Sequence, residues 1–142
     1  MGKNHIKSNI YSKIYLEVIF MIIGIGTDII EINRIRKAVD KTNGFVEKVF
    51  TNKEIEMFKE KNMRYEVIAG NFAAKEAISK SFGTGIRGFS LREIEVLRDE
   101  LGKPIVFLSD NIDRLIGKSY KLNLSISHNN TSAIAFAILE ES

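Results

Sequence analysis

The sequence NFAAKEAISKSF, residues 71–82, carries the clearest secondary-structure signal in the chain. Alanine has the highest helix propensity, and the apolar side chains of this stretch recur at helical spacing. A helix is therefore expected to begin at about Tyr65 or Asn71 and to run to Phe82. It should end there, because the glycine-containing run 83–85 follows.

The residues before this helix predict a strand and two further helices. Residues 19–25 form a short, β-branched apolar run that is typical of a buried strand, and the polar pair 27–28 should end it. Apolar side chains then recur at helical spacing from residue 29 to about residue 41, which predicts a helix. The next helix should open at Thr51, because Thr51 and Glu54 have the spacing of a capping box.

The residues after the central helix predict two hairpins. Short strand-like runs at 93–97 and 105–108 flank a Gly-Lys-Pro turn, and a short helix is expected at about 111–116. Two more strands, at 122–127 and 132–139, flank an Asn-Asn turn. An early strand, a block of helices and then hairpins together predict an α+β fold, with helices packed on a largely antiparallel β-sheet.

Length, composition and charge narrow the class of protein. A chain of 142 residues is expected to form one domain, and it has no cysteine for a disulfide, a thiolate metal ligand or a nucleophile. The formal net charge is +3, but Lys3, Lys7 and Lys13 lie with Glu17 in the first 20 residues, so the rest of the chain is close to neutral. A concentrated basic patch, typical of a nucleic-acid binder, is therefore not expected.

Residues 1–20 are expected to be an N-terminal extension, outside a single domain that spans residues 21–142. A basic start followed by an apolar run loosely resembles a signal peptide, but Glu17 interrupts the apolar region and no small-residue cleavage site follows. The apolar run is also shorter than the roughly 20 residues that cross a membrane. The absence of cysteine agrees with a reducing compartment, so we expect a cytoplasmic protein that does not associate with membranes.

Asp28, Glu76 and Lys80 are the residues best suited to chemistry, and each has a simpler interpretation. Glu76 and Lys80 lie one helical turn apart, which is also the spacing of a surface ion pair. Asp28 and Glu31 have the spacing of a helix N-cap and its reciprocal acid. Alternatively, Asp28 and Glu76 converge as oxygen ligands for Mg²⁺, which prefers one or two carboxylates, several waters and a substrate phosphate.

Two weaker signals indicate a phosphate contact. Gly83, Thr84 and Gly85 could present bare backbone amides to a phosphate, although a helix that simply ends in glycine is commoner. His128 lies at the end of a predicted strand, where it is either an ordinary turn histidine or a contact to a phosphate or hydroxyl group.

A row of cations on the first predicted helix, Arg34, Lys37 and Lys41, is a candidate docking surface. We call these three residues the basic row. Such a pattern is typical either of a solvated helix face or of a surface that receives an acidic helical partner.

Several motifs, in the same order, resemble the holo-acyl-carrier-protein synthases of the phosphopantetheinyl transferase superfamily. Residues 21–29, MIIGIGTDI, resemble the opening of these enzymes, and Arg34 falls at a position that they also use. The run from Ala69 to Ile86 is similar to their central signature, nearly residue for residue. The GKP sequence at 102–104 and the SISH sequence at 125–128 resemble later landmarks of the family.

The resemblance implies an α+β phosphopantetheinyl transferase fold and a Mg²⁺-dependent reaction. In such enzymes a serine of apo acyl carrier protein attacks the β-phosphate of coenzyme A, and adenosine 3′,5′-bisphosphate leaves. The match implies that Asp28 and Glu76 bind the metal and that Lys80 contacts the phosphates or stabilises the leaving group. It leaves the base that accepts the serine proton open between Glu76 and a water molecule.

The resemblance also implies partners and an assembly. His128 and the 83–85 run would hold the nucleotide, and the basic row would receive the acidic recognition helix of the carrier protein in fatty acid biosynthesis. Small members of the family are homotrimers with active sites between subunits. Asp28 of one chain would then be able to meet Glu76 of another.

Two other functions remain as alternatives on the sequence alone. One is a non-catalytic module that binds an anion or a nucleotide, which the nearly balanced charge of the chain after residue 20 disfavours. The other is a Mg²⁺-dependent phosphohydrolase, which could use the same carboxylates to direct water at a phosphate. A product that depends on a carrier protein would separate the transferase from both.

Overall fold

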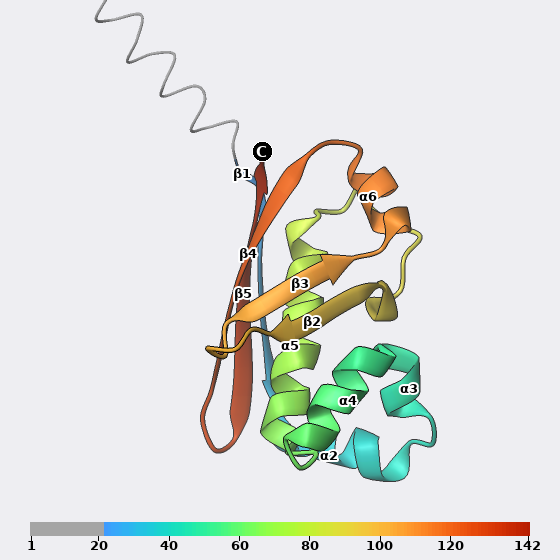
Figure 1. The fold of residues 1–142 in the computed structure, drawn as a ribbon, viewed down its shortest axis with the longest axis vertical. Coiled ribbons are helices and arrows are strands. Elements are labelled where there is room, and N and C mark those ends of the chain that lie inside the picture. The colour runs from blue at the N-terminus through green and yellow to red at the C-terminus, as the bar shows by residue number, and fades with distance from the viewer. Residues whose placement is uncertain (1–21) are drawn as a thin grey trace, which may run out of the picture.

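The structure is a computed structural model that describes residues 22–142 (Figure 1). The expected extension at 1–20 and the start of the strand expected at 19–25 lie outside the described residues. The described elements follow in chain order: β1 (Ile22–Glu31), α2 (Ile32–Lys41), α3 (Phe45–Val49), α4 (Asn52–Glu60), α5 (Tyr65–Ser81), the 3₁₀ turn η1 (Leu91–Glu93), β2 (Ile94–Arg98), β3 (Pro104–Leu108), α6 (Asp110–Ile116), β4 (Tyr120–His128) and β5 (Ser132–Glu141).

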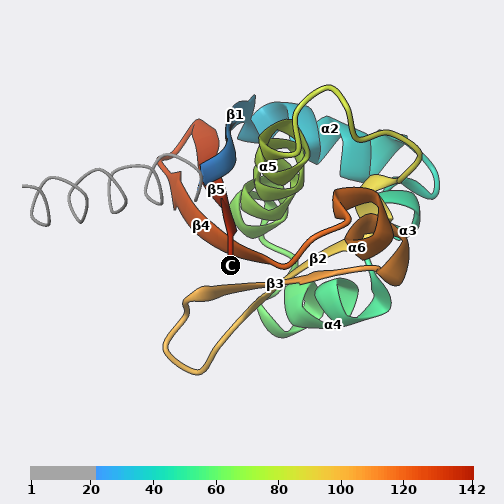
Figure 2. The same ribbon diagram turned by 90° about the horizontal axis from the view of Figure 1, so that it is seen from above.

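Helices pack on two antiparallel sheets, which confirms the predicted α+β class. One sheet has the strand order β1-β5-β4, and the other is the β2-β3 hairpin. The helix α5 lies across one face of the three-stranded sheet (Figures 1 and 2). Alanines line both sides of this contact, among them Ala73 and Ala77 on α5 and Ala135 and Ala137 on β5, and all are buried. Their small side chains allow the helix and the sheet to approach closely.

Two glycines of β1 bring this strand even closer to α5. A Cβ atom at Gly24 would lie 1.9 Å from the carbonyl oxygen of Ser81, and one at Gly26 would lie 1.8 Å from that of Ala77. Real Cβ atoms do not approach backbone oxygens so closely. Glycine is therefore required at both positions for β1 to pack directly on the helix backbone.

The far face of the three-stranded sheet is exposed in the described part of the chain, and it is largely apolar along β1 and β5, whereas the outward residues of β4 are polar. Outward side chains alternate with the inward ones along β1 and β5, as the period of a strand requires. Ile29 is 68% exposed, Ile25 54%, Ile134 44% and Phe136 40%. We call these four residues the outer face.

Local sequence signals gave several elements correctly. Thr51 caps α4, because its hydroxyl accepts a hydrogen bond from the Glu54 backbone and the Glu54 carboxylate accepts one from Thr51 N–H. The two predicted hairpins are present, and β4 and β5 flank the expected Asn-Asn turn. Residues 45–49 form a short helix, α3, that the sequence did not predict.

The predicted boundary between the first strand and the first helix is wrong. The strand β1 continues to Glu31, where it still pairs with Ser132 of β5, and α2 begins only at Ile32. Asp28 is therefore a strand residue, opposite Ala135, and the N-cap interpretation of Asp28 fails. Glu31 occupies the cap position of α2, without a side-chain hydrogen bond to the helix.

No helix within residues 22–142 is long and apolar enough to cross a membrane.

Candidate active site

Asp28 and Glu76 line one pocket of ≈ 400 Å³. The contact between Gly26 and Ala77 explains why they meet. Asp28 lies two residues beyond Gly26, on the same face of β1, and Glu76 immediately precedes Ala77 on α5. Both carboxylates come from the same chain, so a second chain is not needed to bring them together. Arg34 of α2 also lines this pocket.

Lys80 binds Asp28 rather than Glu76. Its ammonium donates hydrogen bonds to Asp28 Oδ1 at 3.0 Å and to the carbonyl oxygen of Thr27 at 2.9 Å. The sequence predicted an ion pair between Lys80 and Glu76, and the predicted acidic partner is wrong. Lys80 pairs with Asp28 because β1 brings this second carboxylate to the same face of α5. The Lys80 side chain is still 55% exposed, so it can also contact a bound anion.

The electrostatic environment of Glu76 favours a proton or a cation. Burial raises the pKa of the Glu76 carboxyl above its ordinary value, and the negative charge of Asp28 raises that pKa further. The positive charge of Lys80 opposes both effects in part. Ionisation of Glu76 beside the Asp28 carboxylate therefore costs free energy, because the two negative charges repel each other. A divalent cation between them would relieve this repulsion.

The two carboxylates fit a magnesium ion for which water and substrate, rather than protein atoms, supply most of the ligands. Within residues 22–142 no group of three or more histidine, aspartate or glutamate side chains is placed to hold a metal. Asp28 and Glu76 would therefore supply two oxygen ligands. Mg²⁺ is commonly held by one or two carboxylates, with waters and substrate phosphates completing the shell.

The run 83–85 and His128 lie at opposite ends of α5. Gly83 follows directly after the helix and has a φ of +76°, so the expected glycine helix end is confirmed. His128 lies at the end of β4, two residues beyond Ile126. The Ile126 side chain packs against Gly70 in the first half of α5, since a Cβ atom at Gly70 would lie 3.1 Å from it. Thirteen residues of helix rise by roughly 20 Å, so a single chain does not bring the two phosphate candidates together.

His128 instead lines a basic groove of ≈ 250 Å³ with Lys61, Arg64 and Arg98. No pattern in the sequence indicated these three cations as a cluster, because Lys61 and Arg64 lie in the α4–α5 turn whereas Arg98 lies at the end of β2. The spacing within any one segment carries no signal for such a cluster.

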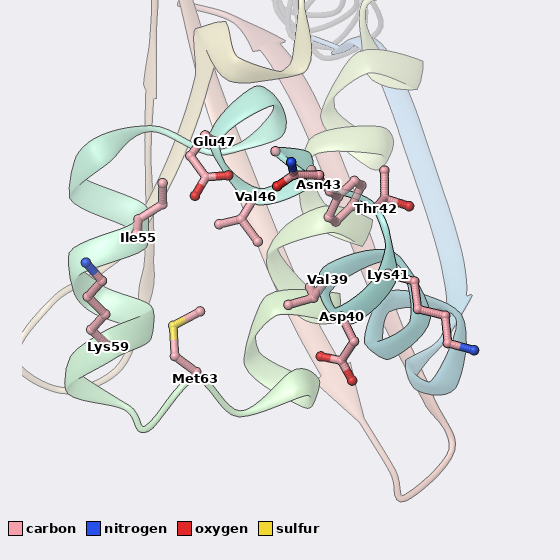
Figure 3. A pocket seen from close by; sticks show the side chains of 12 residues that line it. Val39, Asp40, Lys41, Thr42, Asn43, Val46, Glu47, Ile55, Lys59 and Met63 are labelled. Carbon is pink, nitrogen blue, oxygen red and sulfur yellow. The ribbon is translucent and has the colours of Figure 1, made fainter.

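The basic row lies on α2 with all three side chains exposed, but its members face different surroundings. Arg34 reaches the pocket of Asp28 and Glu76. Lys41 lies at the rim of a separate pocket of ≈ 580 Å³ between α2, α3 and α4, and its ammonium points away from Ile55 and Met63 (Figure 3). The two pockets share Phe45 as a wall.

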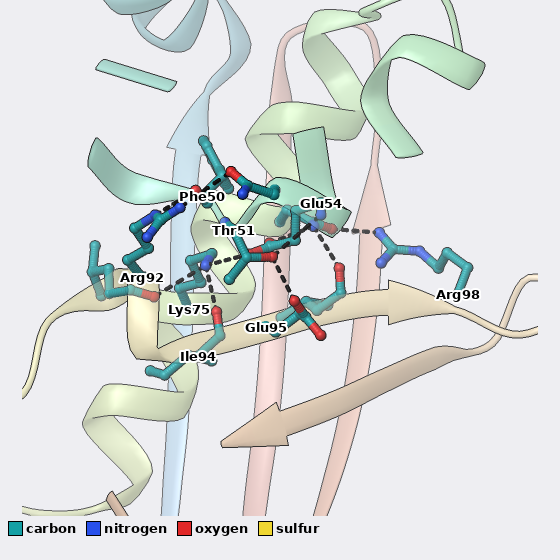
Figure 4. Close-up of polar contacts among 12 residues, drawn as sticks. Phe50, Thr51, Glu54, Lys75, Arg92, Ile94, Glu95 and Arg98 are labelled. Carbon is teal, nitrogen blue, oxygen red and sulfur yellow. Dashed lines mark hydrogen bonds and ion pairs between the residues drawn. The ribbon is translucent and has the colours of Figure 1, made fainter. Parts of the chain in front are cut away.

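Lys75 is a further charged residue of α5, for which the sequence predicted no role. It immediately precedes Glu76, and its side chain is fully buried in an ion pair with Glu54 of α4 (Figure 4). Its position between buried alanines of α5 was the available signal, since a lysine buried there needs a partner.

Comparisons with known proteins agree with this geometry. The sequence profile of the 4′-phosphopantetheinyl transferase superfamily matches residues 24–138. A holo-[acyl-carrier-protein] synthase of Clostridium beijerinckii is 60% identical over 121 residues, which cover 84% of this chain and 98% of the relative. One from Clostridium perfringens is 56% identical over 126 residues, covering 84% of this chain and 95% of the relative.

Solved structures show the same fold. A holo-(acyl-carrier-protein) synthase from Bacillus anthracis, in complex with coenzyme A (3′,5′-ADP), has a TM-score of 0.71 and 43% identity, covering 86% of this chain and 99% of that structure. The Helicobacter pylori enzyme, in complex with coenzyme A, has a TM-score of 0.70 and 34% identity, covering 81% and 98%. The chain belongs to the 4′-phosphopantetheinyl transferase superfamily, among the holo-[acyl-carrier-protein] synthases.

Proposed function

We propose that this chain transfers the 4′-phosphopantetheine group of coenzyme A to a serine of apo acyl carrier protein, in a reaction that requires Mg²⁺. The serine oxygen forms a bond to the β-phosphorus, the pyrophosphate bond breaks, and adenosine 3′,5′-bisphosphate leaves. The observation that carries the proposal is the meeting of Asp28 and Glu76 in one pocket, with Lys80 bound to Asp28. The names of the relatives and the coenzyme A complexes of two neighbours support it.

In this proposal Asp28 and Glu76 hold the metal, which supplies neutralisation of the charge on the pyrophosphate when bound. Lys80 keeps the Asp28 carboxylate in place, and its exposed ammonium contacts the phosphates. The proton of the serine hydroxyl passes either to Glu76 or to a water beside it. Because its pKa is raised, the Glu76 carboxylate is a stronger base than an ordinary exposed glutamate.

We assign carrier-protein docking to the basic row. Arg34 lines the pocket of Asp28 and Glu76, and Lys37 and Lys41 continue along the same exposed helix. An acidic helix that docked on α2 would bring a serine at its end close to the two carboxylates. The resemblance, which places an acidic recognition helix on the carrier, supports this assignment.

We propose that the nucleotide is held between two chains of a homotrimer. If the 83–85 run and His128 both contact one coenzyme A, they must belong to different chains, because α5 separates them by roughly 20 Å within one chain. The groove around His128 contains Lys61, Arg64 and Arg98, which suit a phosphate. The exposed apolar outer face supports such an assembly, because patches of this kind commonly mark interaction surfaces.

The remaining assignments rest on the resemblance. We place the reaction in the cytoplasm and its product in fatty acid biosynthesis. We also propose that residues 21–142 form the single transferase domain, and the matched range of 24–138 falls inside these bounds.

The direct test is the intact mass of the carrier protein. The purified protein is incubated with coenzyme A, Mg²⁺ and apo acyl carrier protein, with EDTA and Glu76→Ala as controls. A mass gain of one phosphopantetheine group, lost in both controls, is expected. Release of adenosine 3′,5′-bisphosphate without a change in the carrier would instead identify a phosphohydrolase. Binding of coenzyme A by a folded protein without either product would identify a non-catalytic nucleotide-binding module.

A further inference from the structure

A buried ion pair anchors the residue next to Glu76. Lys75 donates to Glu54 Oε1 at 2.6 Å, to the carbonyl oxygen of Leu91 at 3.0 Å, and to that of Ile94 (Figure 4). Both charged side chains are 0% exposed. The three bonds use the full donor capacity of the ammonium group and connect α5 to α4, η1 and β2.

The Glu54 carboxylate is equally well satisfied. It accepts hydrogen bonds from Asn71 Nδ2 at 3.0 Å and from Thr51 N–H at 3.1 Å, besides the one from Lys75. Asn71 in turn donates to the carbonyl oxygen of Val96 and accepts from Arg98 Nη2 at 2.9 Å. Among the described residues, no buried side-chain nitrogen or oxygen lacks a hydrogen-bond partner. The network is therefore complete.

Stability alone does not explain this pair. Taking two charges out of water is costly, and an apolar pair of similar volume commonly stabilises a fold as well or better. The pair supplies directional contacts, together with Asn71, which lies one turn earlier on α5 and belongs to the same network. The rest of the neighbouring surface of α5 is formed largely by alanines such as Ala73 and Ala74. Smooth contacts of this kind define the rotation of a helix only weakly.

The rotation of α5 decides where Glu76 points. A side-chain tip lies about 5 to 6 Å from the helix axis, so a rotation of about 15° would move it by roughly 1.5 Å. A misplacement of about 1 Å in a catalytic group can lower a rate by roughly 100-fold. On the sheet side, α5 is held by Gly24 and Gly26; on the opposite side, it is held by Lys75.

We propose that Lys75 and Glu54 are positioning residues, whose buried pair fixes the rotation of α5 so that Glu76 meets Asp28 across the pocket. The inference rests on the proposed function, since it concerns the same pair of carboxylates. It predicts that loss of the pair weakens divalent-cation binding beyond what an equal loss of stability would cause.

The test replaces the pair by apolar side chains of similar size, in the double variant Glu54→Leu/Lys75→Met, which leaves no unpaired charge. Mg²⁺ is titrated by calorimetry into the full chain saturated with coenzyme A, and unfolding is followed in urea. Ile68→Val is the matched control, because Ile68 is a buried α5 residue with no polar contact to the pair. We expect the double variant to bind Mg²⁺ at least tenfold more weakly, and the control to stay within twofold.

The outcomes separate this inference from the proposed function. If the wild-type chain does not bind Mg²⁺, or if Glu76→Ala binds it as tightly as the wild type, the proposed function fails. This inference then fails with it. If the wild type binds Mg²⁺ and the folded double variant binds it equally well, only the positioning role is overturned. Should the double variant not fold, Lys75→Met alone removes the three bonds of the ammonium, while Asn71 and Thr51 N–H still donate to Glu54. Unchanged Mg²⁺ affinity in that variant would overturn the inference.

Discussion

Gly26 of β1 approaches Ala77 of α5 so closely that a Cβ atom on the glycine would lie 1.8 Å from the alanine carbonyl oxygen. This backbone contact joins a strand and a helix that are far apart in the sequence. It also sets the distance between the two carboxylates, because Asp28 and Glu76 lie beside it on the two elements. The pocket of Asp28 and Glu76 therefore depends on two positions of β1, Gly24 and Gly26, that carry no side chain.

Substitution of Gly26 by alanine should be strongly destabilising. The added methyl group meets backbone rather than a mobile side chain, so β1 must move away from α5, at a cost of at least about 1 to 3 kcal/mol. Urea unfolding measures the change in free energy. Gly85→Ala is the control, because nothing lies within 4 Å of a Cβ atom at that position, and it should change stability by less than about 0.5 kcal/mol. Equal stability of the two variants would contradict the close contact.

Substitution of Lys80 by alanine should lower activity far more than stability. Its bond to Asp28 is half exposed to water, and such ion pairs contribute about 1 kcal/mol or less. Loss of a charge aimed at the reacting phosphates commonly lowers a rate by roughly 100-fold or more. The transfer rate is measured from the mass of the carrier protein. Lys118→Ala, which removes a comparable exposed pair with Glu141, should leave the rate unchanged.

The raised pKa of Glu76 makes both stability and Mg²⁺ binding depend on pH. A carboxyl whose pKa is higher in the folded than in the unfolded state stabilises the fold at low pH, and this contribution is lost as the pH rises through the folded pKa. Glu76→Gln should therefore raise the melting temperature in EDTA at a pH above the folded pKa of Glu76, where the wild-type carboxylate is ionised beside Asp28. A lower melting temperature for this variant would contradict the direction of the shift.

Mg²⁺ should compete with a proton for the Glu76 carboxylate. Its affinity for the wild type is expected to rise with pH through the raised pKa of Glu76 and then to level off, because the ligand must be ionised. Calorimetric titrations across this range measure the effect. An affinity that does not change below neutral pH would argue against Glu76 as a ligand.

The secondary structure was largely predictable because its signals are local. The capping box of Thr51 and Glu54, the helix end at Gly83 and the two hairpins each depend on a few neighbouring residues. The same local reasoning misplaced Asp28. Its spacing to Glu31 resembles a helix cap, but pairing with β5, more than 100 residues away, keeps it in a strand.

The site was predictable only through the family resemblance. Spacing on one helix suggested a pair of Glu76 with Lys80, whereas the partner of Lys80 comes from another element. The burial of Lys75 depends on Glu54, on a different helix, and the groove of His128 combines several segments. Contacts of this kind are set by the tertiary fold, so composition and periodicity could not give them.

A charge on the outer face should prevent the proposed homotrimer. Phe136 is 40% exposed on β5, and Phe136→Lys would place a cation on an apolar surface that is buried in such an assembly. We expect a monomer in analytical ultracentrifugation and loss of transfer activity, with the fold retained. Leu115→Lys is the control, because Leu115 is 38% exposed and lies on α6, outside the three-stranded sheet. A wild-type monomer with full activity would contradict the trimer.

Reversal of one charge in the basic row should weaken the carrier interaction without affecting the chemistry. Lys37 is exposed on α2 and does not line the pocket of Asp28 and Glu76, so Lys37→Glu should raise the KM for the carrier about tenfold and leave kcat within about twofold. Raising the salt concentration should reduce the difference between wild type and variant, because exposed charges are screened. Lys53→Glu, which reverses an equally exposed charge at the start of α4, should have little effect. If both variants raise the KM equally, the net charge of the protein, rather than a docking surface on α2, attracts the carrier.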